Sequence, residues 1–224
     1  MSRAVLFDTE TTGLDPLTGD RVIEIAALEL HRDLPTGRVY HVLIDPERDI
    51  PPEASRVHGF TREDLRGKPT FDAVIADFLE FIGDDPLIAH NAPFDFGFIN
   101  AELARLSMPS LAAGRMIDTL AMAKARFPGL PNSLDALCRR FDIDLSARTT
   151  HNALLDCKLL AEVYVELTGG RQRGLVLAES VTRITATYTH DLAARIPRPI
   201  LVPADDLARH AAFVARLTDP VWGA

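Results

Sequence analysis

The pattern of apolar and polar residues divides the first part of the chain into strands and turns. Short apolar runs predict strands over residues 3–8, 21–31 and 37–46. Few residues separate these runs, and successive strands with short connections usually form an antiparallel meander. We therefore expect a three-stranded antiparallel sheet at the start of the chain.

Further along, the apolar spacing alternates between that of helices and that of short buried strands. The expected segments are helices over 71–82 and 94–106, helices beginning near 119, 133 and 152, and strands over 86–91 and 115–118. Added to the meander, this order predicts an α/β fold with a mixed five-stranded sheet flanked by helices.

The stretch "TGGRQRG" after Leu167 indicates a flexible break in the chain. We expect a domain over residues 1–168, a linker over 169–199 and a C-terminal segment over 200–224. The last part contains a helix-like stretch over 205–217. One face of this helix carries Leu207, Ala211, Val214 and Leu217.

The C-terminal helix is too small to bury its apolar face alone. It either packs back on the first domain or docks on a partner as a tail. Phe213 and Trp222 are the candidate anchors for such a partner interface.

Composition narrows the classes of protein. The net charge of -8 argues against binding nucleic acid by bulk electrostatics. No stretch approaches the ~20 apolar residues of a membrane span, and the first residues do not resemble a signal peptide. Cys138 and Cys157 are the only cysteines and form no paired motif, which is typical of a reducing cytoplasm.

The first strand ends in two acids, within "LFDTETTGLD". Because side chains alternate along a strand, Asp8 and Glu10 share one face, and Thr9 lies on the other. A solvated strand end with a turn-forming acid would explain this stretch by itself. Two further acids favour a different explanation.

Asp95 and Asp156 each stand at the head of an apolar helical stripe. An ionised carboxylate that faces a core is unfavourable unless a positive charge pairs with it. No Lys or Arg is expected beside these acids on the same face. Divalent cations shared by the four acids are therefore the predicted partners.

Carboxylate ligands favour hard cations, so we expect two divalent cations, Mg²⁺ or Mn²⁺. Two ions ~3.5–4 Å apart serve in-line displacement at phosphorus, one activating water and one stabilising the leaving oxygen. His151 lies five residues before Asp156 and is expected just before the helix. It is either an exposed cap residue or the general base.

Two other acids are expected to be structural. Asp118 is expected to cap the helix that follows it. Glu24 alternates with apolar neighbours in the second strand and is expected to bond to structural partners.

Three motifs, "FDTETTGL", "HNAPFDFGFIN" and "HNALLDCKLLAEVY", together resemble the DnaQ-like (DEDDh) family of 3'–5' exonucleases. The resemblance covers residues 3–168. It implies a ribonuclease-H-like fold, with Asp8, Glu10, Asp95, His151 and Asp156 as catalytic residues and the four acids as metal ligands.

"PLTGDRVIEIAALEL", "VHGFT" and "PNSLDALCRRFDI" resemble the proofreading subunits of bacterial DNA polymerase III. This implies two partners: the polymerase (alpha) subunit, bound by the C-terminal segment, and the beta sliding clamp. The candidate clamp motif is "QRGLVL" at 172–177, with Gln172, Leu175 and Leu177; a chance match of six residues is the alternative.

The resemblance further implies a substrate, the single-stranded or frayed 3' end of a DNA primer. Candidate contacts to it are Thr9, Glu10, Thr11, His58 and Asn91. The expected function is removal of mispaired 3'-terminal nucleotides as 5'-monophosphates. An RNA-trimming exonuclease and a non-catalytic scaffold that joins polymerase and clamp are the alternatives.

Overall fold

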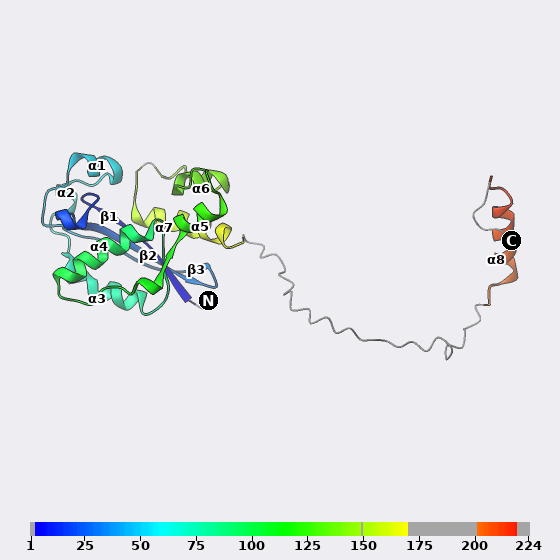
Figure 1. Ribbon diagram of the computed structural model, residues 1–224, viewed down its shortest axis with the longest axis horizontal. Helices are drawn as coiled ribbons and strands as arrows, with labels where there is room; N and C mark the ends of the chain where they lie inside the picture. Colours follow the sequence, from blue (N-terminus) through cyan, green and yellow to red (C-terminus); the bar gives the residue numbers. More distant parts are fainter. Residues whose placement is uncertain (1–2, 149, 170–200, 219–224) are drawn as a thin grey trace. The chain divides into compact units, whose positions relative to one another are not determined.

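The computed structural model describes residues 3–148, 150–169 and 201–218 (Figure 1). The chain divides into two units: residues 3–169 lie in the first and residues 201–218 in the second. Among the described residues, no helix has both the length and the apolarity needed to cross a membrane.

A mixed sheet forms the centre of the first unit. Its strands are β1 (Arg3–Thr11), β2 (Val22–His31), β3 (Leu34–Leu43), β4 (Leu87–Ala89) and β5 (Met116–Asp118). The order across the sheet is β3-β2-β1-β4-β5. β1, β2 and β3 pair antiparallel, whereas β4 is parallel to β1 and β5 is parallel to β4. The meander and the five-stranded mixed sheet are confirmed.

The hairpin between β2 and β3 is tighter than the sequence indicated, so β3 starts at Leu34 and not near residue 37. His31 and Leu34 are direct partners, and only Arg32 and Asp33 lie between them. Both have positive φ, 53° and 66°. Two successive left-handed residues match the right-handed twist of a hairpin, which is the geometry of a two-residue turn.

Seven α-helices and two short 3₁₀ turns are described in the first unit. The helices are α1 (Pro52–His58), α2 (Arg62–Leu65), α3 (Phe71–Ile82), α4 (Ala92–Arg105), α5 (Thr119–Arg126), α6 (Leu134–Arg140) and α7 (Ala153–Leu167). The turns are η1 (Pro16–Thr18) and η2 (Ala113–Arg115). α1 and α2 were not predicted because each is short and buries a single residue, too few for a helical stripe.

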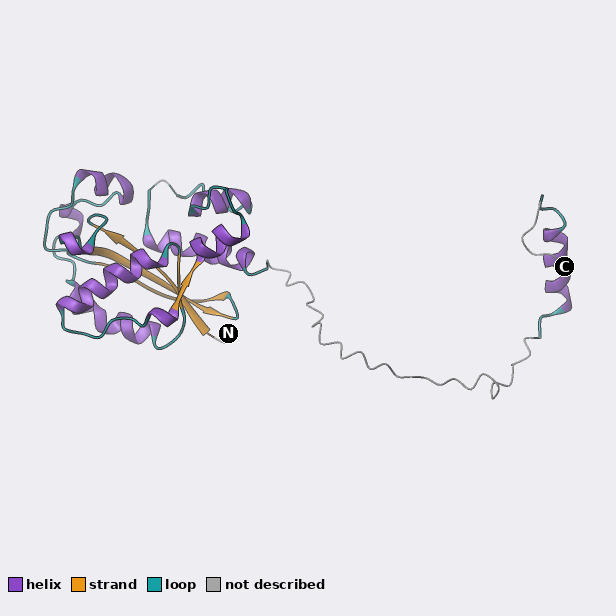
Figure 2. Cartoon of the chain, viewed as in Figure 1, coloured by secondary structure: helices purple, strands orange, loops and turns teal. Residues whose placement is uncertain are grey.

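Helices cover both faces of the sheet and enclose two apolar cores (Figure 2). Val5 and Phe7 face the first core, together with residues of α3 and α4. Ala4 and Leu6 face the second, together with residues of α5, α6 and α7. The alternation along β1 is therefore confirmed, and this central strand is buried on both sides.

The second unit contains the helix α8 (Ala204–Val214). It begins after Pro203 and carries two acids in its first turn, which suits the positive end of a helix dipole. Its length is close to the expected 205–217. Leu207 and Phe213 are 56% and 58% exposed.

Candidate active site

The last part of β1 carries the first two acids, Asp8 and Glu10. Asp8 is partly buried, and Glu10 is only 7% exposed. Glu10 of β1 pairs with Glu24 of β2, and the strand register shifts just after this pair, between Glu10 and Thr11. The shift ends the regular ladder at the point where the carboxylates emerge.

Asp95 arrives from the opposite face of the sheet. It lies in the first turn of α4 and is 2% exposed. Its Oδ1 accepts hydrogen bonds from the backbone N of Thr9 at 3.0 Å and from Thr9 Oγ1 at 2.7 Å. Thr9, predicted to contact substrate, therefore uses both of its donors to hold Asp95.

Asp156 lies in the first turn of α7 and is 4% exposed. The start of α7 is held by Glu24, which is fully buried in β2. Glu24 accepts hydrogen bonds from Asn152 Nδ2 at 3.0 Å and from the backbone N of Ala153 at 3.1 Å. The expected structural role of Glu24 is confirmed, and it fixes where α7 begins relative to the sheet.

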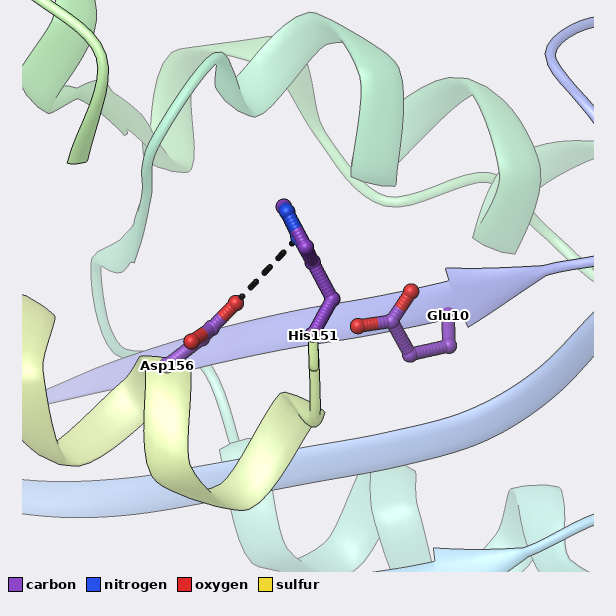
Figure 3. Close-up of side chains that lie close together, drawn as sticks. All are labelled: Glu10, His151 and Asp156. Carbon is purple, nitrogen blue, oxygen red and sulfur yellow. Dashed lines mark ion pairs between the residues drawn. The ribbon is translucent and has the colours of Figure 1, made fainter. Parts of the chain in front are cut away.

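His151 lies just before α7, as predicted, and its side chain is 50% exposed. Its backbone N donates to the carbonyl of Val57 in α1 at 3.0 Å. Its Nδ1 is 3.6 Å from Asp156 Oδ2. Figure 3 marks this pair with a dashed line. His151 thus stands beside Asp156 and opposite Glu10, on a segment tied to α1.

Arg148 overturns the expectation that no Lys or Arg lies beside the acids. Its Nε donates to Asp156 Oδ1 at 2.5 Å, and its Nη2 donates to Asp156 Oδ2 at 2.7 Å. Arg148 belongs to the irregular segment between α6 and α7, where neither helical nor strand periodicity applies. The only sequence signal was a cation eight positions before Asp156.

All five proposed catalytic residues line one cavity of about 750 Å³, which we call the acidic cavity. Its walls come from the end of β1, from α1, from the start of α4 and from the start of α7. Its proposed catalytic members are Asp8, Glu10, Asp95, His151 and Asp156.

Burial and mutual repulsion shift Asp8, Glu10 and Asp95 toward their protonated forms. Burial raises the pKa of Glu10 from 4.5 to about 8, with further repulsion from Glu24, Asp156 and Asp95. Burial also raises the pKa of Asp95 from 3.8 to about 7, against the hydrogen bonds from Thr9. The pKa of Asp8 lies well above its usual 3.8, first through burial and then through Asp95 and Glu10.

These residues fit a divalent cation. Glu10, His151 and Asp156 each offer a ligand atom, and the three atoms lie within 4.8 Å of one another. Crowded, buried carboxylates repel one another, and a hard cation with oxygen ligands would relieve that repulsion.

The raised pKa values of Glu10 and Asp95 predict that stability falls as pH rises when a chelator is present. Some carboxyl groups have a higher pKa in the folded than in the unfolded protein. Such a group stabilises the fold fully below its unfolded pKa, and this stabilisation is lost as pH rises through its folded pKa. For Glu10 the window runs from about 4.5 to about 8. We expect the melting temperature in EDTA to drop by roughly 10 °C between pH 5.5 and 8.5.

Thermal unfolding followed by circular dichroism measures this drop. Glu10→Gln should flatten the profile, because the amide does not titrate. An equally steep profile in that variant would show that other groups cause the pH dependence.

Of the other predicted substrate contacts, two line the acidic cavity and one does not. His58 is 4% exposed and lines the acidic cavity, as does Thr11. Burial lowers the pKa of His58, with a further contribution from His151. Asn91 is exposed at the N-cap of α4 and lines neither the acidic cavity nor the one next to it.

Asp118 is confirmed as a helix cap, since its side chain accepts from the backbone N of Leu120 at 3.0 Å. The clamp-motif residues Gln172, Leu175 and Leu177 lie outside the described residues, and so does Trp222. Leu207 and Phe213 lie exposed in α8 and Val214 is half-buried, so their proposed contact with the polymerase stays a prediction.

A second cavity, of about 860 Å³, adjoins the acidic cavity and was not foreseen from the sequence. The two share Asp8, His90, His151 and Asp156. The second cavity is also lined by α5 and α6, which contribute Lys124 and Asp135, and by Arg148. Among the described residues that line the two cavities, Lys and Arg occur in the second cavity and not in the acidic cavity.

Comparison with known proteins places these features in a family. The RNase_T exonuclease family model matches residues 5–164. DNA polymerase III subunit epsilon of Rickettsia conorii is 45% identical over 221 residues, which is 96% of each chain. The subunit of the same name from Escherichia coli K12 is 43% identical over 178 residues, covering 76% of this chain and 73% of that protein.

Two solved structures share the architecture. Exonuclease X, in complex with 5' overhanging duplex DNA, has a TM-score of 0.59 and 26% identity. It covers 75% of this chain and 92% of its own. A zinc-bound complex of E. coli ExoI with single-stranded DNA has a TM-score of 0.64 over 77% of this chain and 41% of that one. At 20% identity the latter supports the fold alone.

Proposed function

Because the chain belongs to the RNase_T exonuclease family, we propose that it is the proofreading 3'–5' exonuclease of a DNA polymerase III. It hydrolyses mispaired 3'-terminal nucleotides of DNA to 5'-monophosphates during replication. The observation that carries the proposal is the gathering of four carboxylates and His151 in one cavity.

The chemistry assigned to the site depends on divalent cations, Mg²⁺ or Mn²⁺, of which we propose two. Asp8, Glu10, Asp95 and Asp156 would hold them. Bound there, such ions supply an activated water and stabilise the developing charge on the phosphate and the leaving oxygen. The raised pKa values of Asp8, Glu10 and Asp95 are consistent with carboxylates that a divalent cation would stabilise.

His151 is the proposed general base. Its side chain is half exposed and lines both cavities, so it can reach a water at the scissile phosphate. A neutral imidazole takes the proton of the attacking water at its unprotonated ring nitrogen. Asp156, 3.6 Å from Nδ1, would stabilise the resulting imidazolium.

The acidic cavity is the proposed place of the terminal nucleotide. Thr9, Glu10, Thr11 and His58 line it, and these remain our candidates for substrate contacts. Because Thr9 already donates to Asp95, its role would be to set the position of a metal ligand beside the substrate. Asn91 is the weakest of the candidates, since it lines neither cavity.

The proposed partners are the alpha subunit of the polymerase, through residues 200–224, and the beta sliding clamp, through residues 172–177. The exposed Leu207 and Phe213 of α8 support the first of these. Co-purification of the alpha subunit with the full chain, and its loss when residues 200–224 are removed, would test that contact. The proposed role in replication implies a cytoplasmic location.

Matched single-stranded DNA and RNA oligonucleotides, labelled at the 5' end, test the proposed activity. With Mg²⁺ we expect stepwise shortening of DNA from its 3' end, faster than that of RNA, and no shortening with EDTA. Faster degradation of RNA would favour an RNA-trimming enzyme. Intact DNA and RNA would favour a scaffold without catalysis.

A further inference from the structure

Arg148 is the most heavily engaged cation next to the proposed metal ligands. Its side chain is only 9% exposed. Besides its two hydrogen bonds to Asp156, its Nη1 donates to Asp135 Oδ1 at 2.6 Å. Its Nη2 also lies 3.1 Å from Nδ1 of His151. One guanidinium thus joins two acids and the proposed base.

The contact between Arg148 and Asp156 has the geometry of a strong ion pair. Planar, bidentate arginine–carboxylate pairs give short, charge-assisted hydrogen bonds. Both oxygens of Asp156 face the guanidinium, at 2.5 and 2.7 Å. A cation that binds Asp156 must share these oxygens with a positive group of the protein, and like charges at this distance repel.

The structure offers a place for the displaced guanidinium. Arg148 and Asp135 both line the second cavity, of about 860 Å³. Asp135 is an existing partner of Arg148, and its side chain is 39% exposed. Movement toward Asp135 would keep one ion pair while it releases the oxygens of Asp156.

We propose that Arg148 is a built-in counter-ion of Asp156 that competes with the divalent cation, so that cation binding shifts Arg148 onto Asp135. The proposal rests on the proposed function only in taking Asp156 as a cation ligand. Arg148 is then a positioning residue that sets the affinity of the site for its metal. It also balances the charge of the buried acids when no cation is bound.

Direct Mn²⁺ binding to the full chain tests this competition, read from the loss of the free-ion electron paramagnetic resonance signal. Arg148→Gln is expected to tighten Mn²⁺ binding by roughly tenfold to a hundredfold, the weight of a charge-assisted hydrogen bond. Arg148→Gln should also lower the melting temperature in EDTA. The increase in melting temperature on addition of Mn²⁺ should be larger than in the wild type. Unchanged or weaker Mn²⁺ binding would overturn the proposal.

Arg3→Gln is the matched control. Arg3 makes comparable ion pairs with Glu29 and Asp85, at the opposite end of β1. Its loss should lower the melting temperature equally with and without Mn²⁺ and leave Mn²⁺ affinity unchanged.

Asp135→Asn provides a second variant with an effect of opposite sign. Without Asp135, Arg148 loses its alternative ion-pair partner and stays on Asp156, so Mn²⁺ binding should weaken. In the Arg148→Gln background the same change should have no effect. If Asp135→Asn weakens binding equally in both backgrounds, it acts by charge alone and the transfer of Arg148 is refuted.

Asp156→Asn separates this proposal from the proposed function. Loss of Mn²⁺ binding in Asp156→Asn, with no gain in Arg148→Gln, would reject the competition and leave the metal assignment intact. Undiminished Mn²⁺ binding in Asp156→Asn would reject both.

Discussion

Replacing Asp8 by asparagine is expected to abolish nuclease activity and yet to stabilise the protein when a chelator is present. Activity should fall by at least ~10³-fold, because a carboxylate that holds a catalytic cation supplies several kcal/mol of transition-state stabilisation. Stability should rise because a neutral amide is easier to bury than a carboxylate and because it ends the repulsion with Asp95, Glu10 and Asp156. We expect a gain of roughly 5 °C in melting temperature in EDTA at pH 8.

The two effects are measured on one preparation, by oligonucleotide shortening and by thermal unfolding with and without Mg²⁺. Wild type should gain stability on addition of Mg²⁺, and Asp8→Asn should gain far less. Asp72→Asn is a suitable control, since Asp72 is exposed at the start of α3, outside both cavities. Retained nuclease activity in Asp8→Asn would refute the metal assignment.

His151→Ala is expected to slow hydrolysis by roughly 10²–10⁴-fold, the usual contribution of a general base. Because the side chain of His151 is half exposed, the fold should tolerate its removal. The loss should appear in kcat and not in KM, and Mn²⁺ affinity should change little. Added imidazole should restore part of the rate.

The outcome for His151 separates two roles that its position allows. Its ring lies within 4.8 Å of ligand atoms of Glu10 and Asp156, so it is also able to bind a cation. A large loss of Mn²⁺ affinity, without rescue by imidazole, would make it a ligand and not the base. His31→Ala, an exposed change at the end of β2, controls for loss of an imidazole elsewhere.

The acids were predictable from sequence because regular elements carry them. Alternation along β1 put Asp8 and Glu10 on one face, and helical stripes put Asp95 and Asp156 toward the cores. α3 spans residues 71–82 as predicted, since its buried residues follow the helical period closely.

What the sequence could not supply comes from irregular segments. Arg148 has no periodic neighbours that would place it, and its long side chain reaches Asp156 from outside any helix or strand. The hydrogen bond from Thr9 to Asp95 forms because α4 packs on the sheet. Contacts of this kind depend on how separate elements meet, which a local pattern does not encode.

The position of β1 at the centre of the sheet has a consequence for the synthesis of the protein. The ribosome makes this strand before its neighbour β4, which begins at Leu87, and before α7, which carries the last proposed ligand, Asp156. Contacts between residues so distant in sequence make folding slow, because long loops must close before any of them forms. The proposed site is therefore incomplete in the nascent chain until α7 has left the ribosome.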